Sequence, residues 1–127
     1  MTNTGWRLKY RRVYRPPEET SIYALIEPDT GEIRYVGKAD NLHKRLLVHV
    51  SWTRGANDSF PKTMWIRSLL ARNQRPEMIE LERVPFAKAR ERECYWIARK
   101  VYEGCDLVNH PREISAALAH AAQEDAS

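Results

Sequence analysis

The 127-residue sequence contains no long apolar run and only two cysteines. No stretch approaches the roughly eighteen consecutive apolar residues of a membrane-spanning helix, and the N-terminus has no apolar signal region. Neither a membrane role nor a secretory role is therefore expected. Cys94 and Cys105 are too few for a disulfide framework and make no convincing zinc site. We expect an intracellular, cytoplasmic protein with both thiols reduced.

Length and composition indicate one globular domain with a modest core. A hydrophobic fraction of 43% and a charged fraction of 30% are ordinary for a soluble protein. No internal repeat or low-complexity tract is present. We divide the chain into a basic N-terminal arm (1–19), a central domain (20–110) and a C-terminal tail (111–127).

Basic residues outnumber acidic ones by 21 to 17, and the net charge of +4 is compatible with a polyanionic partner. Residues 6–15 carry five basic side chains and no acidic one. Aromatic and apolar residues alternate with them, which favours a strand that could follow a nucleic-acid backbone. A solvated edge strand protected by its charges is an equally good interpretation. The nucleic-acid-binding candidates are Arg7, Lys9, Arg11, Arg12 and, further along the chain, Lys44.

Two predicted strands, 20–27 and 32–37, each carry one tyrosine and flank the turn sequence Pro-Asp-Thr-Gly. A four-residue loop would place Tyr23 and Tyr35 on opposite faces of this hairpin. A three-residue loop, with Gly31 left-handed at a bulge, would place both on one face. The sequence permits either loop. We expect the three-residue loop, because a shared site requires it.

A helix is predicted directly after the hairpin, from a cap at Asp40 to about residue 52. Lys44, Arg45 and His49 lie off its apolar stripe, and Arg45 and His49 are one turn apart. That stripe consists of Leu42, Leu46 and Val50.

A second helix from about residue 61, a strand over 77–84 and a long helix over 86–103 complete the predicted domain. The tail is expected to be helical to about residue 122 and then frayed. The fold class is therefore α/β of the α+β kind. It has a small three-stranded antiparallel sheet flanked by helices, in the order β-β-α-α-β-α.

The side chains of these elements suit work on a phosphodiester. Its cleavage needs an activated water, neutralised phosphoryl oxygens and a stabilised leaving oxygen. Arg45 can bind a phosphate bidentately. Tyr23 or Tyr35 can relay a proton if a cation or the nearby Lys38 lowers its pKa. Mg²⁺ would need one or two carboxylates, and spacing alone does not choose among Glu91, Glu93, Glu103 and Asp106.

Singly, each of these residues has an ordinary structural explanation, but their order along the chain closely resembles the signature of the GIY-YIG nuclease family. The resemblance covers about residues 20–110. Two departures are Ser21 in place of the first block's glycine, and Asn57-Asp58-Ser59 where some relatives have a second histidine. The matching blocks are Ser21-Ile22-Tyr23, Tyr35-Val36-Gly37-Lys38, Asp40-Asn41-Leu42, Lys44-Arg45-Leu46 with His49, Glu91-Arg92-Glu93 with Tyr95-Trp96-Ile97, and Leu107-Val108-Asn109.

The resemblance implies a metal-dependent endonuclease and assigns roles by position. Tyr23 acts as the general base or positions it, and Tyr35 helps to hold the water near the metal. Arg45 binds the scissile phosphate, and His49 assists proton transfer.

The resemblance also implies one divalent-metal ligand, Glu93, which holds Mg²⁺ with Mn²⁺ as a substitute near the leaving 3′ oxygen. Asn109 orders the site, and Lys38 lowers the pKa of a phenol. The implied reaction is a one-metal hydrolysis that leaves a 5′-phosphate and a 3′-hydroxyl.

The expected partner is DNA, cut with low sequence specificity or by structure, because the chain has no room for a further DNA-binding domain. A targeting protein could direct it, and we expect a monomer or a weak dimer. One alternative is a catalytically silent nucleic-acid-binding module of the same fold, although the retention of Glu93 argues against it. Another is a small interaction subunit whose basic arm binds RNA or a protein.

Overall fold

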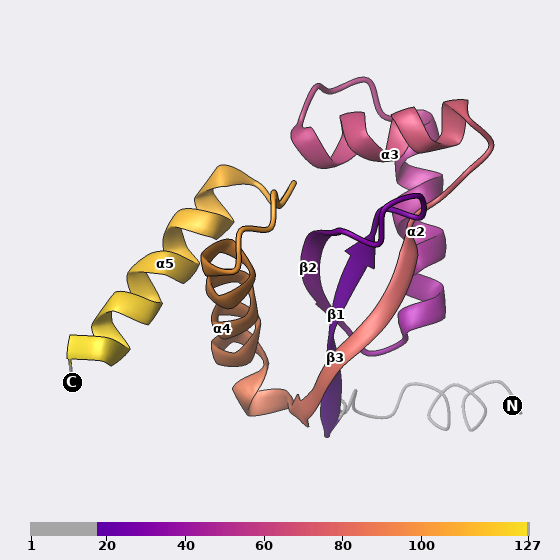
Figure 1. Ribbon diagram of the computed structural model, residues 1–127. Coiled ribbons are helices and arrows are strands. Elements are labelled where there is room, and N and C mark those ends of the chain that lie inside the picture. Colours follow the sequence, from indigo (N-terminus) through magenta and orange to yellow (C-terminus); the bar gives the residue numbers. More distant parts are fainter. Residues whose placement is uncertain (1–17, 127) are drawn as a thin grey trace, which may run out of the picture.

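The computed structural model describes residues 18–126 and places a three-stranded antiparallel sheet between two pairs of helices (Figure 1). The sheet order is β2-β1-β3, which confirms the predicted α+β fold class. Arg7, Lys9, Arg11 and Arg12 lie outside the described residues. The elements are β1 (Glu19–Ile26), β2 (Ile33–Ala39), α2 (Leu42–Gly55), α3 (Pro61–Ala71), β3 (Glu77–Pro85), the 3₁₀ turn η1 (Phe86–Lys88), α4 (Ala89–Tyr102) and α5 (Pro111–Ala126).

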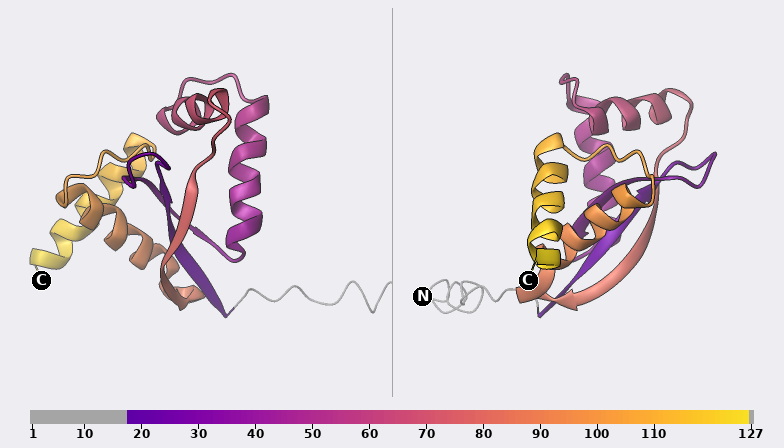
Figure 2. Two further views of the ribbon diagram at one scale, coloured as in Figure 1. Left: turned by 45° about the vertical axis from the view of Figure 1, so that its right-hand side comes forward. Right: turned by 60° about the vertical axis from the view of Figure 1, so that its left-hand side comes forward.

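Each face of the sheet has its own hydrophobic core. Helices α2 and α3 cover one face, and α4 and α5 cover the other (Figure 2). The first core holds Tyr23 and Leu25 from β1, with Ile66 and Leu69 from α3. The second core holds the strand side chains that point to the opposite face, together with Ile97 and Ala98 from α4 and Ala117 from α5. Strand alternation therefore sends Tyr23 toward α2 and α3.

The hairpin places both tyrosines on one face, but not through the predicted three-residue loop. The Glu27 N–H donates to the Glu32 carbonyl at 2.9 Å, so the loop has four residues, 28–31. The two tyrosines share a face because β2 has a bulge. Ile26 pairs with Ile33 whereas Leu25 pairs with Tyr35, so Arg34 is an extra residue in β2 and shifts Tyr35 to the face of Tyr23. Gly31 is left-handed, as expected, with φ of 76°.

Residues 106–109 cover the outer edge of β2 and hold this bulge in place. The Arg34 Nε donates to the Asp106 carbonyl at 2.8 Å, and the Val108 N–H donates to the Arg34 carbonyl at 2.5 Å. An unpaired strand edge exposes backbone donors and acceptors, and this segment pairs with those of Arg34 and Val36.

Helix α2 begins, and helix α5 ends, differently from the prediction. Asn41, not Asp40, caps α2, because its side-chain oxygen accepts the Lys44 N–H at 2.9 Å. Helix α5 starts at Pro111 and runs through the predicted tail, and its Ala117 is 1% exposed against α4. No helix of the described residues is long and apolar enough to cross a membrane.

Candidate functional site

Tyr23, Tyr35 and His49 meet on the sheet face covered by α2 and α3. The Tyr23 Oη lies 2.6 Å from the His49 Nε2. The Tyr35 ring centroid is 6.2 Å from that of Tyr23 and 5.3 Å from that of His49. Tyr23 and His49 are buried, at 1% and 6% exposure. Residues from both strands of the hairpin and from the next helix thus form one cluster, which we call the tyrosine cluster.

Gly37 makes room for this arrangement, because it lies directly opposite Tyr23 in the strand pairing. A Cβ at position 37 would lie 2.7 Å from the Tyr23 Oη and 2.8 Å from its Cζ. Such distances are far inside van der Waals contact, so only glycine lets the phenol pass across β2 toward His49.

Burial governs the acidity of both phenols. Desolvation raises the pKa of Tyr23 well above its usual value, and negative charge on Tyr35 and Glu93 raises it further, while Arg45 lowers it. Desolvation likewise raises the pKa of Tyr35, with Glu113 and Glu93 adding to the increase. Arg45 does lower the pKa of each phenol, as expected of a nearby cation, but burial outweighs it and the net pKa of both phenols is raised.

The histidine of the cluster is neutral at pH 7. Burial, together with the positive charges of Lys62 and Arg45, lowers the pKa of His49 to about 3. With the ring proton of the neutral imidazole on Nδ1, the Tyr23 O–H donates to Nε2, and a proton relay from Tyr23 to His49 needs this tautomer.

This shift predicts a specific loss of stability on acidification. The unfolded chain binds a proton at His49 below about pH 6.5 whereas the folded chain does not until about pH 3, so the stabilising contribution is present above the unfolded pKa and lost as pH falls. Between pH 7 and pH 5, the free energy of unfolding should fall by about 2 kcal/mol more in the wild type than in His49→Gln. Urea unfolding of both proteins at each pH measures this difference. Parallel pH curves would contradict a buried neutral His49.

Arg45 is the cation most available to an anionic ligand. Its side chain is exposed and makes no hydrogen bond or ion pair within residues 18–126, yet its charge lowers the pKa of Tyr23, Tyr35 and His49. Lys44 and Arg45 together line an open depression of about 380 Å³ at the start of α2. Asp40 also lines the depression, so it presents two cations and one carboxylate.

Glu93 is the one of the four candidate carboxylates that acts on the tyrosine cluster. Its charge raises the pKa of both phenols, and its Oε1 lies 3.2 Å from the Lys38 Nζ. The other three carboxylates pair elsewhere: Glu91 with Lys88, Glu103 with Arg99 and Lys100, and Asp106 with Arg34.

Lys38 was predicted to lie beside a phenol, but it does not. Strand alternation turns its side chain to the other face of the sheet from Gly37, toward α4. No group of three or more histidine, cysteine or acidic side chains gathers within residues 18–126. A cation held by one carboxylate, with water and phosphate oxygens as its other ligands, suits the donors present.

Asn109 clamps β2 between Tyr35 and Gly37. Its Oδ1 accepts the Val36 N–H at 3.0 Å, and its Nδ2 donates to the Val36 carbonyl at 2.8 Å. Asn109 is 1% exposed, so both hydrogen bonds are shielded from water. The backbone that carries Tyr35 is thereby fixed from its open edge.

Two further charged residues reach the cluster without having been predicted. The Lys62 Nζ lies 5.3 Å from the Tyr35 ring centroid. Glu113, in the first turn of α5, raises the pKa of both phenols and also accepts the His110 N–H at 3.1 Å. Proline at the first helical position with glutamate two residues later is a helix-start signal that could have located Glu113.

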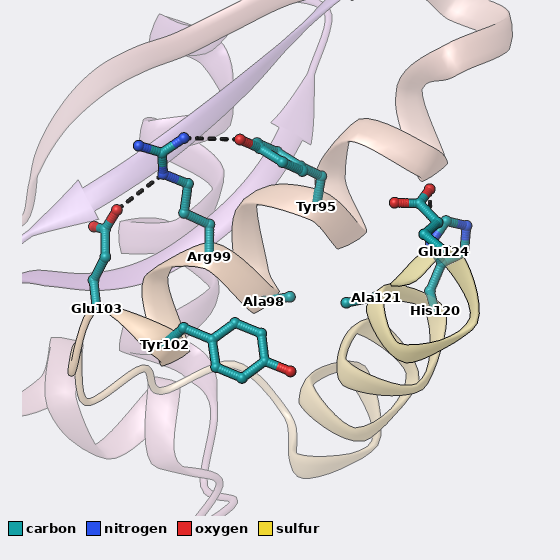
Figure 3. Close-up of a pocket in the computed structure, with 8 residues that line it drawn as sticks. All are labelled: Tyr95, Ala98, Arg99, Tyr102, Glu103, His120, Ala121 and Glu124. Atoms are coloured by element: carbon teal, nitrogen blue, oxygen red, sulfur yellow. Dashed lines mark hydrogen bonds and ion pairs between the residues drawn. The ribbon is translucent and has the colours of Figure 1, made fainter. Parts of the chain in front are cut away.

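A larger cavity, of about 420 Å³, lies between α4 and α5, and its one predicted site residue is Glu103, from the four candidate carboxylates (Figure 3). Its charged groups are already paired: Arg99 binds Glu103 and the Tyr95 hydroxyl, and His120 binds Glu124. Ala98 and Ala121 face each other across it (Figure 3). The tyrosine cluster, and not this cavity, has the residue types that phosphodiester chemistry needs.

No protein-family model, curated protein sequence or solved structure matches this chain.

Proposed function

We propose that the protein is a divalent-metal-dependent DNA endonuclease of the GIY-YIG type. The observation that carries the proposal is the buried hydrogen bond of 2.6 Å between the Tyr23 phenol and a neutral His49. Any buried phenol needs a hydrogen-bond partner, but a neutral imidazole is a partner that can also take up the phenol proton, as a proton relay requires. Arg45, exposed and unpaired among the described residues, lies beside the pair.

The proton relay avoids a free phenolate, which the raised pKa of Tyr23 disfavours. A water that donates its hydrogen bond to the Tyr23 oxygen can pass a proton to it as the phenol proton moves to the His49 Nε2. The products of this transfer are a hydroxide, a neutral phenol and an imidazolium. A phosphate on Arg45 would supply negative charge that raises the pKa of His49 and favours the transfer.

Arg45 supplies the second requirement, charge neutralisation on the phosphoryl oxygens. A guanidinium can bind two oxygens of one phosphate in a fixed geometry, and Lys44 adds a second positive charge at the same depression.

Glu93 would hold the divalent metal, with Lys38 positioning its carboxylate at 3.2 Å. When bound, Mg²⁺ would stabilise negative charge on the phosphate and on the leaving 3′ oxygen. Tyr35, beside Tyr23 and within reach of the Glu93 charge, would help to hold the attacking water. The products are a 5′-phosphate and a 3′-hydroxyl.

The proposed substrate is DNA, taken in the cytoplasm by a monomer or a weak dimer with little sequence specificity or with a preference for branched structures. A targeting protein could add specificity. Binding should weaken steeply with salt, because phosphate contacts would dominate it.

The proposal is tested by nicking of supercoiled plasmid with Mg²⁺, with EDTA as the metal-free control. We expect Arg45→Ala to lower the nicking rate by about a hundredfold, because it removes one preorganised contact to the reacting phosphate. Arg54→Ala, which changes another exposed arginine of α2, should retain the wild-type rate. DNA binding without nicking under Mg²⁺ and Mn²⁺ would instead support a catalytically silent module.

A further inference from the structure

A second, smaller pocket adjoins the tyrosine cluster. It encloses about 230 Å³, and Tyr35 forms one of its walls. Trp52 of α2 and Phe60, just before α3, also line it, and they remain 64% and 56% exposed. His110 contacts Phe60 edge to face, with ring centroids 5.4 Å apart. Rings from four separate segments of the chain therefore surround one space, and we call it the aromatic pocket.

The charges of the aromatic pocket differ from those of a phosphate site. Lys62 lines it, but so do two carboxylates, Asp58 and Glu113. Each carboxylate is held by a backbone hydrogen bond, from Phe60 to Asp58 at 3.0 Å and from His110 to Glu113 at 3.1 Å. A phosphate would be repelled by these groups, whereas a planar ring with N–H donors at its edge would be bound by them.

The aromatic pocket and Arg45, the proposed phosphate-binding residue, are linked by helix α2. Arg45, His49 and Trp52 follow one another along one side of α2, with Arg45 and Trp52 about two turns apart. A strand whose phosphate lies on Arg45 would thus run past Tyr35 toward Trp52.

We propose that the aromatic pocket receives one unpaired nucleobase of the nucleic-acid substrate. Its volume lies below the range of about 300–1,000 Å³ typical of pockets for larger ligands, which suits a single base. Exposed aromatic rings bind bases by stacking, and the carboxylates can accept the amino group of cytosine or adenine. A base stacked within a continuous duplex could not enter.

The inference deepens the proposed function by naming a substrate class: DNA with an unpaired nucleotide beside the scissile bond, as in a bulge or flap. Base binding is measured without metal, so that its result does not depend on cleavage. Fluorescence anisotropy in EDTA would compare two duplexes of equal length, one with a single bulged adenosine and one with an abasic site at the bulge. Both have the same sugar-phosphate backbone and charge, and only one has the base.

The wild-type protein should bind the adenosine bulge about tenfold more tightly than the abasic bulge, since stacking of one base contributes about that factor. Trp52→Ala and Phe60→Ala should each reduce the difference to about twofold or less. Phe86→Ala, which removes another exposed phenylalanine (49%) far from the pocket in sequence, should retain it.

Equal affinity of the wild type for both bulges would overturn the inference, even if the protein nicks plasmid and the proposed function stands. Tenfold discrimination without any Mg²⁺-dependent cleavage would overturn the proposed function and leave the pocket's role intact. If Trp52→Ala instead changes the sedimentation of the free protein without altering discrimination, the aromatic surface is a contact between copies of the chain and the inference is wrong.

Discussion

Replacing Glu93 with alanine is expected to lower the rate of Mg²⁺-dependent cleavage by at least about a thousandfold. A metal that stabilises charge in the transition state contributes several kcal/mol, and each 1.4 kcal/mol corresponds to about tenfold in rate. Among the four acidic candidates of the α4 region, only Glu93 acts on both phenols. Steady-state nicking rates over a range of Mg²⁺ concentrations measure the loss.

The fold should tolerate this substitution. Glu93 pairs with Lys38, and although the Glu93 side chain is only 16% exposed, that of Lys38 is 44% exposed, so that water screens the pair and its contribution is about 1 kcal/mol. Thermal unfolding should therefore change little while activity disappears. Glu91→Ala is the matched control, since Glu91 lies on the same helix and pairs only weakly with Lys88 at 3.8 Å. Equal activity of Glu93→Ala and Glu91→Ala would refute Glu93 as the metal ligand.

The second large effect is expected at Gly37. A methyl group there would lie 2.7 Å from the Tyr23 Oη, so the phenol or the strand must move. Gly37→Ala should cost about 1–3 kcal/mol of stability through overpacking. It should also lower the cleavage rate by about a hundredfold, because displacement of a reacting group by about 1 Å has that effect. Denaturant unfolding and plasmid nicking measure the two losses.

Two comparisons separate this clash from a general effect of adding a methyl group. Gly55→Ala adds the same methyl where no atom lies within 4 Å, and it should be nearly neutral. In a Tyr23→Ala background, Gly37→Ala should cost little stability, because the atoms that it meets are gone. Additive losses in this double-mutant cycle would show that the two side chains do not oppose each other.

The general arrangement of the fold was predictable because it follows from local patterns. Period-2 strands, a Gly-containing turn and a helix with its apolar stripe predicted the order of the elements, and the structure confirms the three-stranded antiparallel sheet. The shared face of Tyr23 and Tyr35 was also predicted, but by the wrong loop. A bulge at Arg34 depends on hydrogen bonds to residues 106–108, which no local pattern of the hairpin contains.

The electrostatics of the site were less predictable, since they depend on burial. The family resemblance implied proton-transfer roles for Tyr23 and for His49, but not that both are desolvated and neutral. The partner of Lys38 was also missed, because the position of α4 relative to β2 decides which carboxylate the lysine meets. The charge of Glu113 reaches the cluster only because α5 packs back onto the domain.

The clamp formed by Asn109 affects when the site can assemble during synthesis. Its two bonds to Val36 join residues 73 positions apart, and closure over such a distance is slow compared with formation of a hairpin. While residue 109 is still inside the ribosome, the N–H and carbonyl of Val36 can hydrogen-bond only to water at this edge. The tyrosine pair is made early, but the rigid edge beside it forms only after residue 109 has emerged. A nascent chain would therefore hold the two tyrosines together before the backbone beside Tyr35 is fixed.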